Sequence, residues 1–176
     1  MLSRGPAPQG EHFLPAGIIE VPGRRWFGMV DGAGLVDLQF TERPDPAWAG
    51  WHSLVLTSLA APADHLALLR ERGIPYVVVG EGRVALGRAL ELLRERLGVE
   101  TVVATGGGRL GGALLRQHLV DEIEVELLPW AVGGRGTPML FDAEPLALDE
   151  WPIRLELLSC ELVEHGRVRL RFRVRS

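Results

Sequence analysis

The sequence predicts an α/β protein: a mixed β-sheet with parallel central strands, helices on its faces and a C-terminal antiparallel hairpin. Between Trp51 and Glu126, short β-branched runs alternate with stretches of helical periodicity, as in βαβ units. Toward the end of the chain, two strictly alternating runs flank a His165-Gly166 turn, which predicts a hairpin. The 176 residues are 47% apolar, enough for a packed core.

The first part of the chain is expected to be less regular. Residues 1–23 hold four prolines and four glycines with weak periodicity, which predicts an extended N-terminal arm and leaves 24–176 as one folded domain. Trp26–Val30 and Leu35–Phe40 are apolar runs separated by Asp31-Gly32-Ala33-Gly34. An Asp-Gly step between two such runs predicts a β-hairpin.

The central region predicts three strands and two helices. The strands are expected at Ser53–Thr57, Tyr76–Val79 and Thr101–Thr105, and the helices at Ala63–Arg72 and Val84–Leu97, each followed by a glycine. The apolar residues expected on the inner helix faces are Leu66, Leu68, Leu69, Leu86, Ala89, Leu90, Leu93 and Leu97.

The last third predicts a short helix and three strands, at Ala113–Leu119, Glu122–Trp130, Ile153–Val163 and Arg167–Arg175. Alternation in the final strand places five arginines on one sheet face. They form either a docking stripe for an anion or a solvated face that pairs with glutamates of the neighbouring strand, and the second interpretation is favoured. The glutamates expected to pair with them are Glu156, Glu161 and Glu164.

Composition excludes several function classes. A net charge of −4 argues against a nucleic-acid binder that neutralises phosphates. All 19 basic residues are arginine, so Schiff-base chemistry on lysine, a Walker-type lysine and a Tyr-x-x-x-Lys reductase pair are excluded. The single cysteine, Cys160, favours a cytoplasmic location, and no apolar stretch is long enough to predict export or membrane insertion.

Few other residues predict chemistry. The five histidines lack metal-ligand spacing, so no metal site is expected. Cys160 is expected to be a small buried hydrophobic residue. Asp121 and Glu122 are either an acid–base pair or, as their place at a strand start favours, residues with a structural or subunit-contact role.

The sharpest candidate site is the glycine segment from Gly106 to Gly112. It follows an expected strand and precedes an expected helix, where glycines allow a tight turn and helix N–H groups favour an anion such as a pyrophosphate. In an open parallel sheet, ligands collect at this carboxyl edge. Glycines at such a turn also occur for close packing alone, and that alternative remains open.

The same residues carry a resemblance to a family. Val-Val-Ala-Thr-Gly-Gly-Gly-Arg-Leu-Gly-Gly, starting at Val102, and Leu-Pro-Trp-Ala-Val-Gly-Gly, starting at Leu128, resemble the C-terminal reductase domain of bacterial riboflavin biosynthesis, the RibD C-terminal domain. The resemblance covers residues 51–142 well and implies a dihydrofolate-reductase-like fold. It also implies that this chain lacks much of the opening third of the family's domain.

The resemblance implies an NADPH-dependent reductase acting on a pyrimidine ribosyl phosphate, similar to 5-amino-6-(5-phosphoribosylamino)uracil reductase, and assembled as a homodimer. It assigns no acid or base, since positioning supplies most of the help to hydride transfer. Thr57 and Ser58 would lie near the adenosine phosphate, and Thr105 near the substrate. The cofactor diphosphate and nicotinamide ribose would be held by Gly106, Gly107, Gly108, Arg109, Leu110, Gly111 and Gly112.

Three positions depart from the family pattern. Thr105 stands where a glutamate is usual, Gly111 where an asparagine is usual, and Leu59 where a basic residue often follows the Thr-Ser strand end. NADPH therefore has no visible anchor over NADH, and NADH is not excluded as the cofactor. The alternative function is that of a non-catalytic, truncated relative that acts as a dimerising or small-ligand-binding domain.

Overall fold

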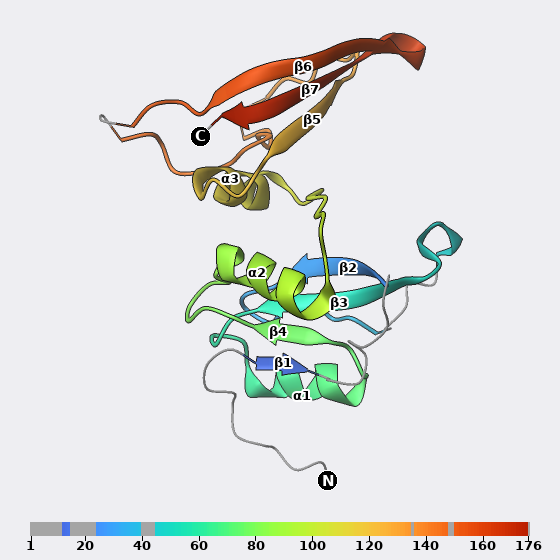
Figure 1. The fold of residues 1–176 in the computed structure, drawn as a ribbon, viewed down its shortest axis with the longest axis vertical. Coiled ribbons are helices and arrows are strands. Elements are labelled where there is room, and N and C mark those ends of the chain that lie inside the picture. Colours follow the sequence, from blue (N-terminus) through green and yellow to red (C-terminus); the bar gives the residue numbers. More distant parts are fainter. Residues whose placement is uncertain (1–11, 15–23, 40–44, 135, 148–149, 176) are drawn as a thin grey trace. The chain divides into compact units, whose positions relative to one another are not determined.

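The computed structural model describes residues 12–14, 24–39, 45–134, 136–147 and 150–175 (Figure 1). These residues fall into two compact units, Met1–Val102 and Val103–Ser176. The first unit contains β1 (His12–Leu14), β2 (Arg25–Val30), a 3-10 turn η2 (Pro46–Trp48), β3 (Trp51–Thr57), α1 (Ala63–Glu71), β4 (Tyr76–Val78) and α2 (Leu86–Leu97). The second contains α3 (Gly108–Arg116), β5 (Glu122–Leu127), β6 (Arg154–Val163), η3 (Glu164–Gly166) and β7 (Arg167–Arg175).

The first unit is built on a four-stranded sheet in the order β1-β4-β3-β2. β2, β3 and β4 are parallel, which confirms the predicted parallel centre, and β1 adds to β4 in the antiparallel sense. Of the expected arm over residues 1–23, only His12–Leu14 in β1 lies within the described part of the chain. Since the three parallel strands share a direction, their carboxyl ends meet at one edge of the sheet.

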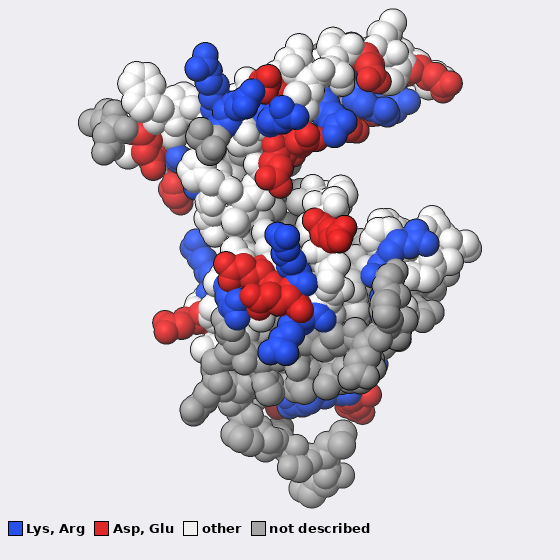
Figure 2. Space-filling view, in the orientation of Figure 1, with Lys and Arg blue, Asp and Glu red and all other residues white. Residues whose placement is uncertain are grey.

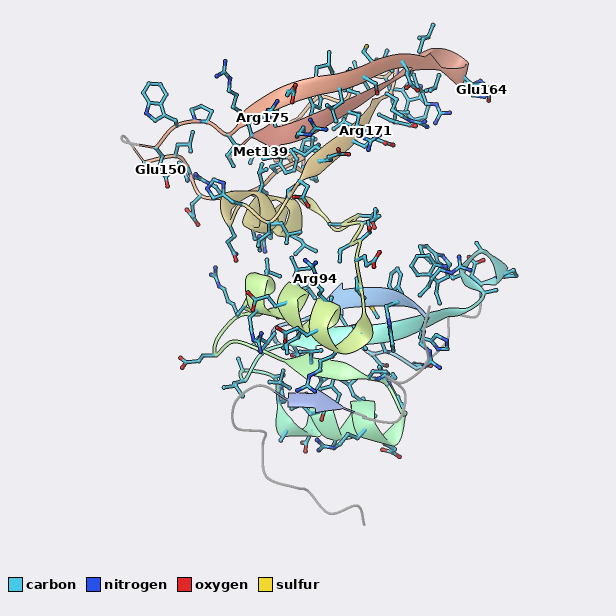
Figure 3. The ribbon with its side chains drawn as sticks, in the orientation of Figure 1. Arg94, Met139, Glu150, Glu164, Arg171 and Arg175 are labelled. Carbon is cyan, nitrogen blue, oxygen red and sulfur yellow. The ribbon has the colours of Figure 1, made fainter. Side chains whose placement is uncertain are left out.

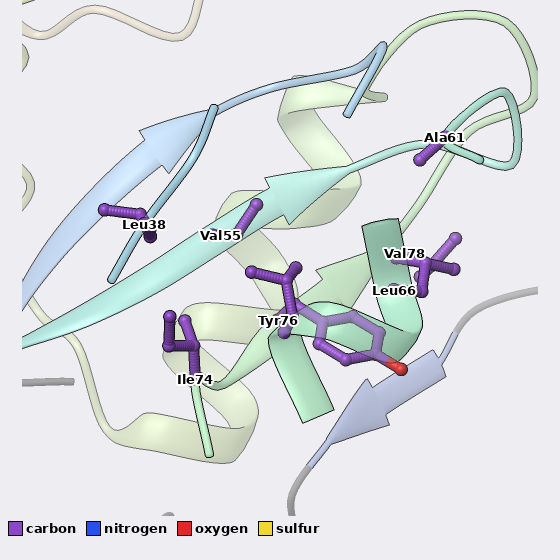
Figure 4. Close-up of a cluster of buried hydrophobic side chains, with 8 residues drawn as sticks. Leu38, Val55, Ala61, Leu66, Ile74, Tyr76 and Val78 are labelled. Atoms are coloured by element: carbon purple, nitrogen blue, oxygen red, sulfur yellow. The ribbon is translucent and has the colours of Figure 1, made fainter. Parts of the chain in front are cut away.

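Two apolar clusters cover the two faces of this sheet. One packs Leu66 and Leu69 of α1 against strand residues that include Val55 and Tyr76 (Figure 4). The other packs α2, through Ala89, Leu92 and Leu93, against alternate strand residues: Leu54, Leu56, Val77 and Val79. The predicted helices are thus confirmed, with α2 turned slightly so that Leu92, rather than Leu90 or Leu97, is buried.

The expected hairpin after Trp26 is wrong. β2 pairs in parallel with β3, and residues 35–39 form no strand. The cause is the Asp31 carboxylate, which accepts hydrogen bonds from the N–H groups of Leu35 at 2.9 Å and Val36 at 2.8 Å. Because these N–H groups bond a side chain, the chain curls into a loop that buries Leu38.

The expected strand at Thr101–Thr105 is also absent from the described structure. This segment has no strand ladder, and the side chains of Val102 and Val103 are 53% and 79% exposed. Its β-branched residues favour a strand, but a strand exists only where a partner completes its hydrogen bonds.

The second unit holds a three-stranded antiparallel sheet in the order β5-β7-β6. The predicted C-terminal hairpin is confirmed, with His165 and Gly166 at positive φ in its turn and a register shift between Leu157 and Ser159. β5 ends at Leu127, three residues before the predicted end, and β6 begins at Arg154.

The arginines of β7 form the charge-paired face that the alternation favours. Arg169 pairs with Glu126 at 2.8 Å and Arg171 with Glu122 at 2.5 Å, so most partners come from β5 rather than from the expected β6. Arg175 pairs with Glu156 of β6 at 2.5 Å. Figures 2 and 3 show these charges intermingled along the sheet, with Arg171 and Arg175 labelled on β7.

Candidate functional site

The glycine segment is largely helical. α3 begins at Gly108, with Gly107 as its N-cap, and not at Ala113 as the sequence predicts. The N–H groups of Leu110 and Gly111 bond the Gly107 carbonyl at 3.0 and 3.2 Å, which closes the first turn. Of the expected cofactor segment, Gly106 and Gly107 precede the helix, and the residues from Gly108 to Gly112 form its first turns.

Close packing explains three of these glycines. A Cβ on Gly108 would collide with the carbonyl oxygen of Met139, and one on Gly112 would lie 2.6 Å from the carbonyl oxygen of Asp142. A Cβ on Gly111 would lie 3.3 Å from the Phe141 ring. The chain after β5 therefore crosses this face of α3 in backbone contact, which no helix with side chains at these positions permits.

The N-terminal end of α3 is more open. A Cβ on Gly107 would meet no atom within 4 Å, although the Leu110 side chain covers Gly106. The Arg109 side chain is 95% exposed and lies 3.7 Å from the Asp142 carboxylate. Unpaired N–H groups in the first turn of a helix, beside an exposed guanidinium, suit an anion. Residues from Thr105 to Gly107, with Arg109, are thus the part of the predicted segment that a ligand can reach.

Thr105, the expected substrate contact, is exposed and precedes this open end directly. Its hydroxyl can donate or accept a hydrogen bond, but it carries no charge.

Thr57 and Ser58 lie at the carboxyl end of β3 in the first unit, and both are fully buried. The Thr57 hydroxyl donates to the carbonyl oxygen of Asp31 at 2.7 Å, and the Ser58 hydroxyl donates to that of Gly32 at 2.8 Å. Each hydroxyl therefore already donates its proton to the backbone of the loop that begins at Asp31. These side chains fit a supporting role at the sheet edge better than direct donation to a cofactor phosphate.

The residue that organises this edge is Asp31, which the sequence places in a hairpin turn and not in a site. Its backbone N–H donates to the Leu56 carbonyl at 2.8 Å, and its carboxylate lies 3.7 Å from Nε2 of His65 on α1. Both side chains are buried, and His65 Nε2 has no hydrogen-bond partner among the described residues. A backbone-bonding Asp before glycines is the signal that could have revealed this loop.

A second loop at the same edge, Gly80–Val84, follows β4. Gly80 has a φ of +89°, and a Cβ there would collide with the Arg83 carbonyl oxygen, so only glycine fits. The Ala85 N–H closes the loop on the Val79 carbonyl at 3.2 Å. Glu81 and Arg83 are both exposed on it. The sequence alone predicts no role for either residue.

Other features of the described chain carry less chemistry. Across its described ranges, no three His, Cys, Asp or Glu side chains gather so as to hold a metal. None of the helices in those ranges combines the length and the apolar character that a membrane crossing requires. An open hollow of about 700 Å³ in the second unit is lined by His118, Arg175 and the residues from Trp151 to Glu156, and not by the glycine segment.

Cys160, Asp121 and Glu122 lie in or beside the antiparallel sheet of the second unit. Cys160 is exposed, not buried, because the apolar face of β6 on which it lies is largely uncovered in the described chain. Glu122 pairs with Arg171, and the Asp121 carbonyl accepts from the Val174 N–H at 2.9 Å, so both residues serve the sheet.

Comparison with known proteins identifies relatives that are named as pyrimidinone phosphate reductases or riboflavin biosynthesis proteins. The chain is 38% identical over 105 residues to the 2,5-diamino-6-ribosylamino-4(3H)-pyrimidinone 5′-phosphate reductase of Methanothermobacter thermautotrophicus, covering 60% of this chain and 48% of that protein. It is 34% identical over 122 residues to the riboflavin biosynthesis protein RibD of Chlamydia muridarum, covering 69% of this chain and 31% of that protein. The chain thus spans less than half the length of these relatives.

The solved structures agree on the fold. A pyrimidine reductase-like protein from Corynebacterium diphtheriae superimposes with a TM-score of 0.66 at 17% identity, over 85% of this chain and 60% of that one. This likeness, with the mixed sheet described above, confirms the dihydrofolate-reductase-like fold class that the resemblance implies. The family model described as the RibD C-terminal domain matches residues 36–168. The chain therefore belongs to the RibD C-terminal domain family.

Proposed function

We propose that this protein is a pyridine-nucleotide-dependent reductase of an aminopyrimidine ribosyl phosphate, with NADPH as its cofactor. The observation that carries the proposal is the open N-terminal end of α3, where Gly107 leaves free space and the Arg109 guanidinium is exposed. Its family membership and the names of its curated relatives support the same reaction class. The chemistry that NADPH supplies is a hydride for the imine carbon of the opened sugar.

In this proposal the diphosphate of the cofactor binds at the start of α3. The N–H groups at the start of α3 that precede Leu110 donate to its oxygens, since those of Leu110 and Gly111 bond the Gly107 carbonyl. Arg109 adds a positive charge in place of its long 3.7 Å contact with Asp142. Gly107 contributes by lacking a side chain, so that the backbone can approach the ligand. The helical residues Gly108, Gly111 and Gly112 contribute indirectly, because they hold α3 against the segment from Met139 to Asp142.

The rest of the described chain fits a reaction that depends on positioning. Thr105 precedes the open end and offers the substrate a hydrogen-bonding hydroxyl. In the first unit, the Thr57 and Ser58 hydroxyls fix the loop that begins at Asp31, which gives them a supporting role. Hydride transfer to an imine needs the two carbons held together more than it needs a strong acid or base.

The test is a reductase assay on the purified chain. NADPH consumption is followed with 5-amino-6-(5-phosphoribosylamino)uracil and, separately, with the 2,5-diamino pyrimidinone compound named for the archaeal relative. Turnover with either compound supports the proposal, and the ratio of the two rates identifies the preferred substrate. Absence of turnover with both, in protein that binds NADPH, would contradict it.

A second candidate function is that of a non-catalytic relative that dimerises or binds a small ligand. The observation that favours it is the exposed segment from Val102 to Thr105, which has no strand partner within the described ranges just before the glycines. The same assay separates the two functions, since this candidate predicts no NADPH consumption with either pyrimidine.

Both candidate functions are compatible with the homodimer that the family resemblance implies. Leu155, Leu157 and Leu162 of β6 are exposed on the apolar face of the second unit's sheet, Leu162 at 80%. Trp151, just before β6, is 88% exposed. Burial of such a surface against a second copy would remove it from water, and aromatic residues are enriched at subunit interfaces. The cytoplasmic location expected from the single cysteine stays a prediction.

A further inference from the structure

The hollow beside the start of β6 lies within the second unit and has no part in the proposed function. Its volume of about 700 Å³ falls within the range of small-molecule sites. His118 lines it just after the end of α3, whereas Gly107 precedes the other end of this helix. A helix of nine residues is about 14 Å long, so a ligand in the hollow is separate from one at the start of α3.

Arg154, at the start of β6, brings an uncompensated positive charge to this hollow. Glu156 lies 2.5 Å from Arg175 and 3.7 Å from Arg173, so its carboxylate is already shared between two arginines of β7 (Figure 3). Within the described ranges, no Asp or Glu side chain forms an ion pair with Arg154. Its partner in the ladder is Arg175, and like charges directly opposite each other destabilise an antiparallel pair. An anion would relieve this repulsion.

His118 occupies a backbone position that glycine usually takes. The Leu119 N–H bonds the Leu114 carbonyl at 3.0 Å, and the His118 N–H bonds the Leu115 carbonyl at 3.1 Å. This pair of bonds ends a helix with a residue at positive φ, and His118 has a φ of +55°. Such a conformation costs free energy in a residue with a Cβ, and residues held at this cost are candidates for a functional role. Here the conformation accompanies an exposed imidazole on the lining of the hollow.

Trp151 gives the same hollow an aromatic surface. Its side chain is 88% exposed. The preceding residue, Glu150, pairs with Arg116 of α3 at 3.1 Å, which ties the chain before Trp151 to this helix. An indole ring favours stacking on another planar ring. Trp151 also belongs to the apolar surface that a second copy could bury, and the two uses give different results on removal of the ring.

We propose that this hollow binds a small ligand in which a planar ring carries a phosphate monoester. The Arg154 guanidinium pairs with the phosphate oxygens through parallel N–H donors, and the His118 imidazole donates a further hydrogen bond. The ligand's ring stacks on Trp151. Arg175 keeps the Glu156 carboxylate neutralised, so that this carboxylate does not repel the anion. The site is independent of the reductase reaction.

The test measures binding of 4-methylumbelliferyl phosphate to the full chain by isothermal titration calorimetry. Inorganic phosphate and 4-methylumbelliferone each carry one part of this ligand and should bind at least about tenfold more weakly than the ester. Arg154→Gln should weaken binding of the ester by about tenfold or more, because the charged pair with the phosphate is lost. Arg94→Gln removes the same charge from an exposed position on α2 of the first unit and should leave the affinity unchanged.

Two further variants separate ligand contacts from structural roles. His118→Gly should weaken binding of the ester and at the same time raise the midpoint of thermal unfolding, since glycine adopts positive φ without strain. A purely structural role for His118 predicts no change in affinity. Trp151→Ala should weaken binding of the ester and leave the oligomeric state, measured by light scattering, as it is in the wild-type protein.

Other results overturn the proposal. They include wild-type protein that does not bind the ester at millimolar concentration, and binding that Arg154→Gln leaves unchanged. Binding that is lost in Arg109→Gln instead would place the phosphate at the start of α3. A Trp151→Ala variant that becomes monomeric would assign the edge of the hollow to a subunit interface. None of these measurements depends on NADPH turnover, so the proposed function stands or falls separately.

Discussion

The N–H group of Asp142 donates a hydrogen bond to the carbonyl oxygen of Gly108 at 2.9 Å, joining the chain after β5 to the first turn of α3. Gly108 and Gly112 permit this contact, because a Cβ at either position would overlap the backbone of Met139 or Asp142. Two functions therefore meet in one glycine segment: Gly108, Gly111 and Gly112 pack, and Gly107 faces open space.

This division predicts different results for two alanine variants. Gly108→Ala should lower the free energy of unfolding by about 1–3 kcal/mol, since the backbone of the crossing segment must move. Gly107→Ala should change it by less than about 0.5 kcal/mol and instead weaken NADPH binding. Chemical denaturation and cofactor titration on both variants measure the two effects. Equal stability losses would show that Gly107 is also a packing residue.

Two buried serines offer a matched pair for the sheet edge. Ser58 and Ser53 are both fully buried, but the Ser58 hydroxyl donates to Gly32 whereas the Ser53 hydroxyl has no partner within the described residues. Ser58→Ala should lower the free energy of unfolding by about 1–2 kcal/mol. Ser53→Ala should leave it unchanged or raise it, because a buried unpaired hydroxyl is removed. Urea unfolding of both variants measures these free energies. A larger loss of stability in Ser53→Ala than in Ser58→Ala would contradict the assigned hydrogen bonds.

Glu150 gives a pH-dependent contact in the second unit (Figure 3). Its carboxylate accepts from the Ala147 N–H at 2.8 Å and pairs with Arg116 of α3 at 3.1 Å, and these contacts hold the pKa of Glu150 below its ordinary value of 4.5. A lowered pKa in the folded state means that the contact stabilises the protein above pH 4.5. The stabilisation is then lost as the pH falls through the lowered pKa.

The stability difference between wild-type protein and Glu150→Gln should therefore be constant near neutrality and vanish in acid. Thermal unfolding of the two proteins across this pH range measures it. A difference that grows as the pH falls below 4.5 would reverse the sign and contradict the contact.

The exposed apolar face of β6 predicts where the proposed homodimer would be broken. Leu157 pairs in register with Phe172, and Leu157→Glu would place a charge in the proposed interface. Light scattering should show a change from dimer to monomer. Glu161→Gln, at a position in register with Arg169 on the opposite face, should remain dimeric. A wild-type monomer, or a dimeric Leu157→Glu, would contradict an interface at this face.

The sequence predicted those elements whose pattern is local. α1, α2 and the C-terminal hairpin follow from periodicity, helix-ending glycines and strict alternation, and the structure confirms each. The failures lie where a distant contact or a side chain decides. Asp31 draws its loop away from a strand, Met139–Asp142 pack closely against the helical glycines, and residues 101–105 have no ladder partner within the described ranges.

In the candidate site, too, some features can be predicted from the sequence and others depend on tertiary contacts. Glycines after a strand-like run are visible in the sequence, and so is the family resemblance that the segments starting at Val102 and Leu128 carry. That the Thr57 and Ser58 hydroxyls already have acceptors 26 residues away is a tertiary fact, as is the position of Arg83 beside Gly32. No spacing rule connects these residues.

Hydride transfer itself is the most direct measurement of the central claim. Purified wild-type protein, given NADPH and 5-amino-6-(5-phosphoribosylamino)uracil or the 2,5-diamino pyrimidinone compound, should oxidise NADPH and yield the ribitylamino product in equal amount. Gly107→Ala should slow the reaction while the protein stays folded. If wild-type protein with millimolar cofactor consumes no NADPH and forms no ribitylamino product, the protein is not this reductase.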